Sequence, residues 1–132
     1  MRLTSTHEKI LLFLIVLHSF IVGIMLMFFA DWAVRFAGWS SGANPIFFIW
    51  QAGAFHFVLA AGYVAEYRRS GTVDLLLIAK TTAFVFLVGG SLLVETPWSV
   101  WFSGFADGAM ALTAFLVHRA VKKDLSGNSH SG

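Results

Sequence analysis

Two ionisable residues of opposite charge, Lys80 and Asp107, lie within otherwise apolar stretches in the second half of the chain. His18 and His56 are placed in the same way in the first half. Side chains of these types can pair with one another, hydrogen-bond to a bound molecule or ligate a metal ion. Which of these they do depends on the elements that hold them.

Those elements are apolar segments long enough to cross a membrane. Residues 10–30, 46–65, 75–94 and 100–117 each contain about 18 to 21 residues, close to the roughly 20 that a helix needs to span the hydrocarbon core. The chain is 58% hydrophobic and only 12% charged, which excludes an ordinary soluble domain. The sequence therefore predicts an all-α fold, an integral membrane four-helix bundle with antiparallel helices.

We expect one domain, residues 1–121, followed by a polar, unstructured tail at 122–132. The predicted helices lie at about 7–30, 45–67, 73–94 and 97–119. Ser5 and Glu8 have the spacing of a capping box at the start of the first helix, and Asn44 with Pro45 is suited to begin the second. The connection between these two helices, residues 31–44, is the longest and could form a short surface helix.

Basic residues are strongly biased to one side of the predicted membrane. Seven lie before the first span, between the second and third, or after the fourth: Arg2, Lys9, Arg68, Arg69, Arg119, Lys122 and Lys123. The opposite side holds only Arg35. Because cytoplasmic segments carry an excess of Lys and Arg, both termini are expected to be cytoplasmic. The charges form no stripe interleaved with aromatic residues, so nucleic acid is not an expected partner.

One polar residue from each predicted helix reaches a common layer. Counted from the cytoplasmic ends at about 1.5 Å per residue, His18, His56, Lys80 and Asp107 lie roughly 9 to 18 Å inside. An unpaired charge at that depth costs about 2.5–3.5 kcal/mol. We therefore expect Lys80 and Asp107 to form an ion pair in the bundle interior, with the two histidines nearby. On the last predicted helix, Asp107 shares one face with Gly104, Ala111, Ala114 and His118.

This intramembrane polar layer has several interpretations. The ion pair could simply fix helix register, or Lys80 could extend to the cytoplasmic headgroups. A ligand site would draw on Gln51, His56, Tyr63, Lys80 and Asp107. Haem ligation by His18 and His56 is less well supported, because it needs two facing imidazoles in a layer that the charged pair crowds.

Two other kinds of chemistry have little support in the sequence. A metal site at His18, His56 and Asp107 is not expected, because no single helix carries a ligand spacing. The chain has no Cys, which excludes thiol catalysis, and no residue is assigned as catalytic. Any redox chemistry would need a bound cofactor, with haem or a quinone as the candidates.

Short motifs in the second to fourth predicted helices resemble a known group. These are Gly53-x-x-His56 leading to Gly62-Tyr63, the single Lys80, and Phe105-x-Asp107-Gly108. In these features the chain resembles the DoxX-like small bacterial membrane proteins. The resemblance implies a four-helix bundle in the bacterial inner membrane and a quinone-linked role. It transfers no binding residues.

Three functions are compatible with the sequence. The first is a non-catalytic accessory or structural subunit that packs against larger membrane proteins or against itself, because the predicted loops are too short to form an active-site domain. The second is a protein that binds a quinone or another small lipophilic ligand in the polar layer. The third is an oligomeric transporter or channel, although the sequence has no clear inverted repeat or discontinuous helix. In each case the lipid bilayer is an expected partner.

Overall fold

The computed structural model describes residues 5–39 and 46–128. This part of the chain is all-helical, with five helices and no strand: α1 (Ser5–Phe28), α2 (Ala30–Phe36), α3 (Phe47–Ser70), α4 (Asp74–Leu93) and α5 (Trp98–Asn128). Four of them, α1, α3, α4 and α5, are long and apolar enough to cross a membrane. The prediction of an all-α fold with four long apolar helices is confirmed.

The end of the last helix differs from the sequence-based expectation, and one expected helix cap lies outside the described residues. The last helix does not end near residue 119 but continues to Asn128, so the expected unstructured tail is wrong over 122–128. Lys and Leu are good helix formers, and the buried Val121 gives this extension a packed face. The short helix α2 lies within the longest connection. The expected cap at Asn44 and Pro45 lies outside the described residues.

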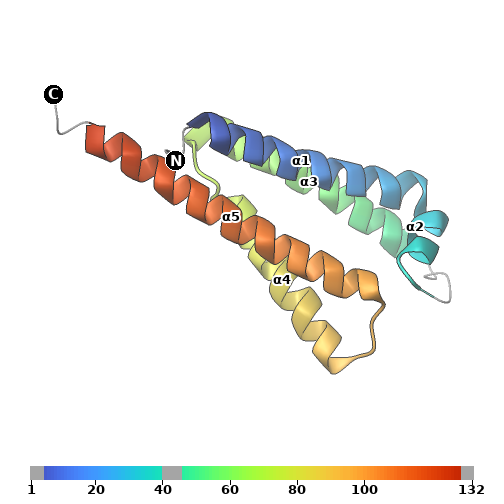
Figure 1. The fold of residues 1–132 in the computed structure, drawn as a ribbon. Coiled ribbons are helices and arrows are strands. Elements are labelled where there is room, and N and C mark those ends of the chain that lie inside the picture. Colours follow the sequence, from blue (N-terminus) through green and yellow to red (C-terminus); the bar gives the residue numbers. More distant parts are fainter. Residues whose placement is uncertain (1–4, 40–45, 129–132) are drawn as a thin grey trace.

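The long helices form two pairs, α1 with α3 and α4 with α5 (Figure 1). In the first pair the backbones approach closely at two glycines: a Cβ on Gly53 would lie 3.0 Å from the Gly23 carbonyl oxygen. In the second pair, a Cβ on Gly108 would lie 2.7 Å from the Phe84 ring. Small residues at such crossings let helix backbones come together where no hydrophobic effect drives association.

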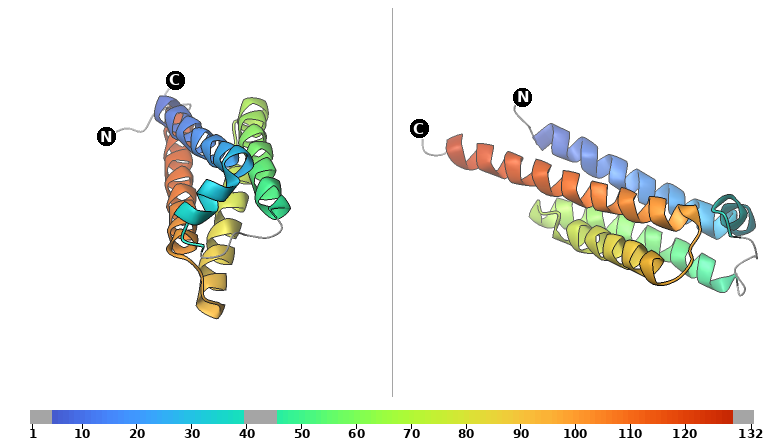
Figure 2. Two further views of the ribbon diagram at one scale, coloured as in Figure 1. Left: turned by 90° about the vertical axis from the view of Figure 1, so that its right-hand side faces the viewer. Right: turned by 60° about the horizontal axis from the view of Figure 1, so that its bottom comes forward.

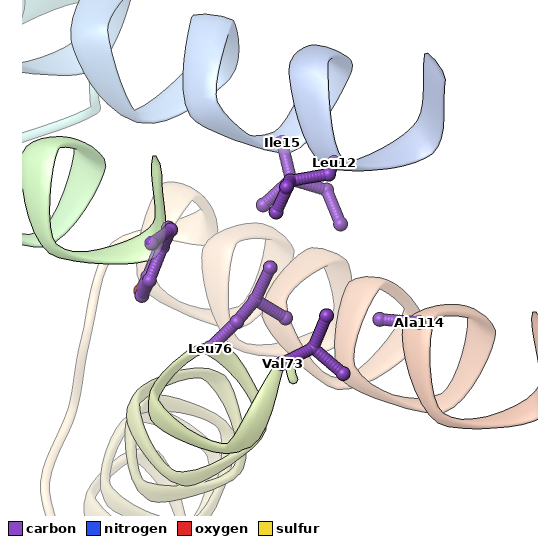
Figure 3. Packing of buried hydrophobic residues seen from close by; sticks show 6 residues of the cluster. Leu12, Ile15, Val73, Leu76 and Ala114 are labelled. Carbon is purple, nitrogen blue, oxygen red and sulfur yellow. The ribbon is translucent and has the colours of Figure 1, made fainter. Parts of the chain in front are cut away.

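The two pairs meet at one end of the molecule, which we call the Glu8 end. There α1 contributes Leu12 and Ile15, which point toward Leu76 of α4 and Ala114 of α5 (Figure 3). Tyr63 of α3 belongs to the same buried cluster and is only 1% exposed. This apolar cluster joins all four long helices.

Toward the other end, which we call the α2 end, the two pairs separate (Figures 1 and 2). Aromatic contacts connect α2 to the start of α5: Trp32 stacks on Phe36 with centroids 5.1 Å apart, and Phe36 meets Trp98 at 6.0 Å. The Ser99 hydroxyl donates a hydrogen bond to the carbonyl of Ala37 at 2.6 Å. The pairs are therefore held at both ends, but most interior packing lies at the Glu8 end.

The turn between α3 and α4 is built by two residues. Gly71 ends α3 in the left-handed conformation with φ of 69°, which glycine adopts without steric cost. Glu66 of α3 then accepts the backbone N–H of Leu75 at 3.0 and 3.1 Å. A carboxylate at this position satisfies a free N–H and complements the positive end of the α4 dipole. The start of α4 is thus fixed relative to α3.

Candidate functional site

Lys80 of α4 and Asp107 of α5 face each other in the interior. The Lys80 Nζ donates to Asp107 Oδ1 at 2.6 Å, and the two residues are 3% and 9% exposed. Lys80 follows Leu76 by one turn, and both are buried. On α5 the expected face is the buried one, since Gly104, Asp107, Ala111 and Ala114 are all buried. The ion pair therefore lies one turn beyond the apolar cluster, toward the α2 end.

The two histidines lie within electrostatic range of this pair but differ in their surroundings. His56 of α3 is half-buried, and its Nδ1 is enclosed without a hydrogen-bond partner. His18 of α1 is exposed. The residue of α1 that faces the interior at this level is the next one, Ser19, which is 1% exposed. Ser19 is not one of the residues that the sequence predicted for the polar layer.

Two hydroxyl groups, like the His56 nitrogen, lack a hydrogen-bond partner. Ser19 Oγ and Tyr63 Oη are both buried and have no hydrogen-bond partner. Tyr63 lies close enough to Asp107 for the carboxylate to act on it electrostatically. Leaving a polar group unpaired in an apolar interior costs about 1–3 kcal/mol by mutational data. Ser19 follows the buried Ile15 by one turn, as Lys80 follows Leu76, so these three atoms form a set of free hydrogen-bonding groups in the same part of the interior.

The remaining expected ligand residue does not join this set. Gln51 of α3 is exposed and lies more than one helical turn before His56. Within residues 5–39 and 46–128, no three His, Asp or Glu side chains lie close enough to hold a metal ion. We therefore define the polar site by its five inward residues, Ser19, His56, Tyr63, Lys80 and Asp107. They come from all four long helices.

A second buried polar group occupies the Glu8 end. The Glu8 carboxylate is 6% exposed; its Oε1 lies 2.5 Å from His118 Nδ1, and its Oε2 accepts the Tyr67 hydroxyl at 3.2 Å. These three residues join α1, α3 and α5. The sequence predicted Glu8 in a capping box and His118 on the same helix face as Asp107. Local spacing could not reveal the contact, because the two residues are 110 positions apart.

This contact predicts a measurable stabilisation. Glu8→Ala removes both hydrogen bonds and leaves the His118 and Tyr67 polar atoms without their partner. A hydrogen bond contributes a net of about 1 kcal/mol, so the loss of two is expected to lower the free energy of unfolding by about 2 kcal/mol. Unfolding in detergent followed by tryptophan fluorescence measures it. The exposed Asp124→Ala is the control, and an equal effect of the two substitutions would contradict the assignment.

Comparisons with protein-family models, with curated proteins and with solved structures found no match to this chain. The polar site must therefore be interpreted from its own geometry. Its arrangement supplies a cation, an anion and three unpaired polar atoms, all buried. Such a site suits a molecule that is largely apolar and carries one or two oxygen atoms.

Proposed function

We propose that the protein is a multi-pass protein of the bacterial inner membrane that binds a quinone or another small lipophilic molecule at the polar site. In this proposal the four long helices form an antiparallel bundle and both termini are cytoplasmic. The bias of Lys and Arg supports that orientation, since α1 begins and α5 ends at the same end of the molecule (Figure 1). The DoxX-like resemblance, with its quinone-linked role, is part of the proposal.

The proposed ligand binding is supported by three buried polar atoms without hydrogen-bond partners, Ser19 Oγ, His56 Nδ1 and Tyr63 Oη. Membrane interiors hold no bulk water, so each of these atoms needs a protein, ligand or bound-water partner. A ligand carbonyl oxygen could accept from the Tyr63 and Ser19 hydroxyls. The Lys80 ammonium has three donors and uses one on Asp107, which leaves two for the ligand.

The experiment compares wild-type protein with Tyr63→Phe. A short-chain quinone should raise the unfolding temperature of the wild type, because a ligand that binds only the folded state stabilises it. Tyr63→Phe should stabilise the ligand-free protein by removing an unpaired hydroxyl, yet lower quinone affinity about 5-fold through loss of one hydrogen bond. Extraction of bound lipids and an ultraviolet-visible spectrum report any ligand that copurifies.

The matched control is Tyr67→Phe, whose hydroxyl is already bonded to Glu8. It should destabilise the protein and leave the quinone-dependent shift unchanged. Two results together would overturn the proposal: no copurifying quinone or similar molecule, and no effect of added quinone on wild-type stability. In that case water alone would satisfy the three atoms.

A second role, that of an accessory subunit without independent catalysis, is favoured by the short connections. The links Gly71–Val73 and Val94–Pro97 leave little protein outside the proposed membrane span. A bound quinone would then exchange electrons with a partner rather than with this chain. Purification from native membranes tests this role directly, and recovery of the protein as an isolated monomer would argue against it.

A further inference from the structure

A continuous apolar groove follows the outer surface of the α1–α3 pair, away from the polar site. One part, of about 350 Å³, starts between Lys9 and Arg68 and is walled by Phe13, Val16 and Val64. A second part, of about 460 Å³, shares Val16, Val64 and Arg68 with the first. It continues toward the α2 end over the small residues Ala60, Ala61 and Ala65, and it ends at Phe20 and Phe57, whose ring centroids are 5.2 Å apart. The shared residues make the two parts one groove.

The length of this groove matches one leaflet of a bilayer. From Lys9 to Phe20 the α1 wall rises about 16 Å, and the α3 wall rises the same distance from Arg68 to Phe57, at about 1.5 Å per residue. The hydrocarbon core of a bilayer is about 30 Å thick, so one leaflet occupies about half of that. An acyl chain entering at Lys9 and Arg68 would end near the two phenylalanines.

The charge at the entrance selects the headgroup. Lys9 and Arg68 are both exposed and line the groove at its start. The neighbouring Glu8 does not line the groove, because its carboxylate is buried against His118 and the Tyr67 hydroxyl. Two cations flanking the start of an acyl-length groove favour a lipid whose headgroup carries a net negative charge.

The α4–α5 pair offers an internal comparison. Its outer groove is larger, about 540 Å³, but its lining contains no charged residue. The lining includes Thr81, Phe84, Gly108, Ala109 and Phe115. A groove of this kind can hold an acyl chain but has no means of selecting a headgroup. Headgroup selection is thus expected on one helix pair and absent on the other.

We propose that the α1–α3 groove is a binding site for an anionic phospholipid of the leaflet at the Glu8 end. One acyl chain lies along Val16, Ala61 and Val64, and the phosphate lies between Lys9 and Arg68. This site is separate from the polar site, so it stands whether or not a quinone binds there.

The experiment titrates the full-length protein with phosphatidylglycerol or phosphatidylcholine of the same acyl chains, and native mass spectrometry counts the bound lipid. Wild type should bind phosphatidylglycerol more tightly. The double variant Lys9→Gln/Arg68→Gln should lose about 25-fold in phosphatidylglycerol affinity, since each basic residue near the surface contributes about a 5-fold preference for anionic lipid. Its phosphatidylcholine affinity should not change.

Two matched controls test the position of the site. Arg119→Gln/Lys122→Gln removes two exposed charges on α5 and should leave the preference intact. Ala61→Phe fills the groove and should lower phosphatidylglycerol binding without a change of charge, whereas Ala109→Phe fills the uncharged groove and should not. Melting curves confirm that each variant is folded.

Three results would overturn the proposal. The first is equal wild-type affinity for the two lipids. The second is an equal loss from the two charge-removing double variants. The third is a dimer that Ala61→Phe converts to a monomer, because a second copy of the chain would then cover the groove.

Discussion

Replacing Lys80 alone by Met is expected to lower the free energy of unfolding by about 3–5 kcal/mol. Lys80 is the hydrogen-bond partner of the Asp107 carboxylate, at 2.6 Å, and both side chains are buried. Without the ammonium, the carboxylate keeps its desolvation cost and loses the attraction that offset it. Titration with a denaturing detergent, followed by the fluorescence of the five Trp residues, gives the change.

The double variant Lys80→Met/Asp107→Leu separates an ion-pair effect from a packing effect. Apolar replacement of a whole buried pair is often neutral or stabilising, so the double variant should recover most of the stability that the single variant loses. Arg69→Met, at an exposed position of α3, should have little effect. If the losses from Lys80→Met and Asp107→Leu simply add in the double variant, the two residues act independently and the pair does not organise the interior.

The contact between Lys80 and Asp107 could be predicted from the sequence for a physical reason. An amine and a carboxylate placed singly in two apolar helices have few other partners to pair with. The cost of leaving either one unpaired therefore fixes the rotation of α4 and α5 about their axes. The small residues Gly104, Ala111 and Ala114 beside Asp107 marked the same face, and they are buried. The cost of an unpaired charge in each helix thus predicted a contact between two residues that are 27 positions apart.

The rotation of α1 could not be determined in the same way. This helix is apolar on all sides, so hydrophobic periodicity does not distinguish His18 from Ser19, its neighbour about 100° around the helix. Packing decides it: Leu12, Ile15, Ser19 and Gly23 are buried at intervals of three and four residues, and His18 falls outside that row. The contact of Glu8 with His118 depends on the same rotation and was missed for the same reason.

The second large effect on stability is expected at a glycine where two helices approach closely. Gly53→Ala is expected to destabilise the protein by about 1–3 kcal/mol, because the new methyl group would lie 3.0 Å from the Gly23 carbonyl oxygen and 3.1 Å from the Met27 nitrogen. Both atoms belong to the backbone of α1, so relief requires the whole helix to move. Gly53→Leu should cost more, since its longer side chain must also fit between the helices.

Gly89→Ala is the matched control, because an added Cβ there has no neighbouring atom within 4 Å. It should stabilise the protein by up to about 1 kcal/mol through the higher helix propensity of alanine. The two substitutions make the same chemical change in two apolar helices, and the structure predicts opposite signs. Denaturant titration of both variants measures the difference. If Gly53→Ala stabilises the protein as much as Gly89→Ala does, α1 and α3 do not cross at these glycines, and the groove between them has a different shape.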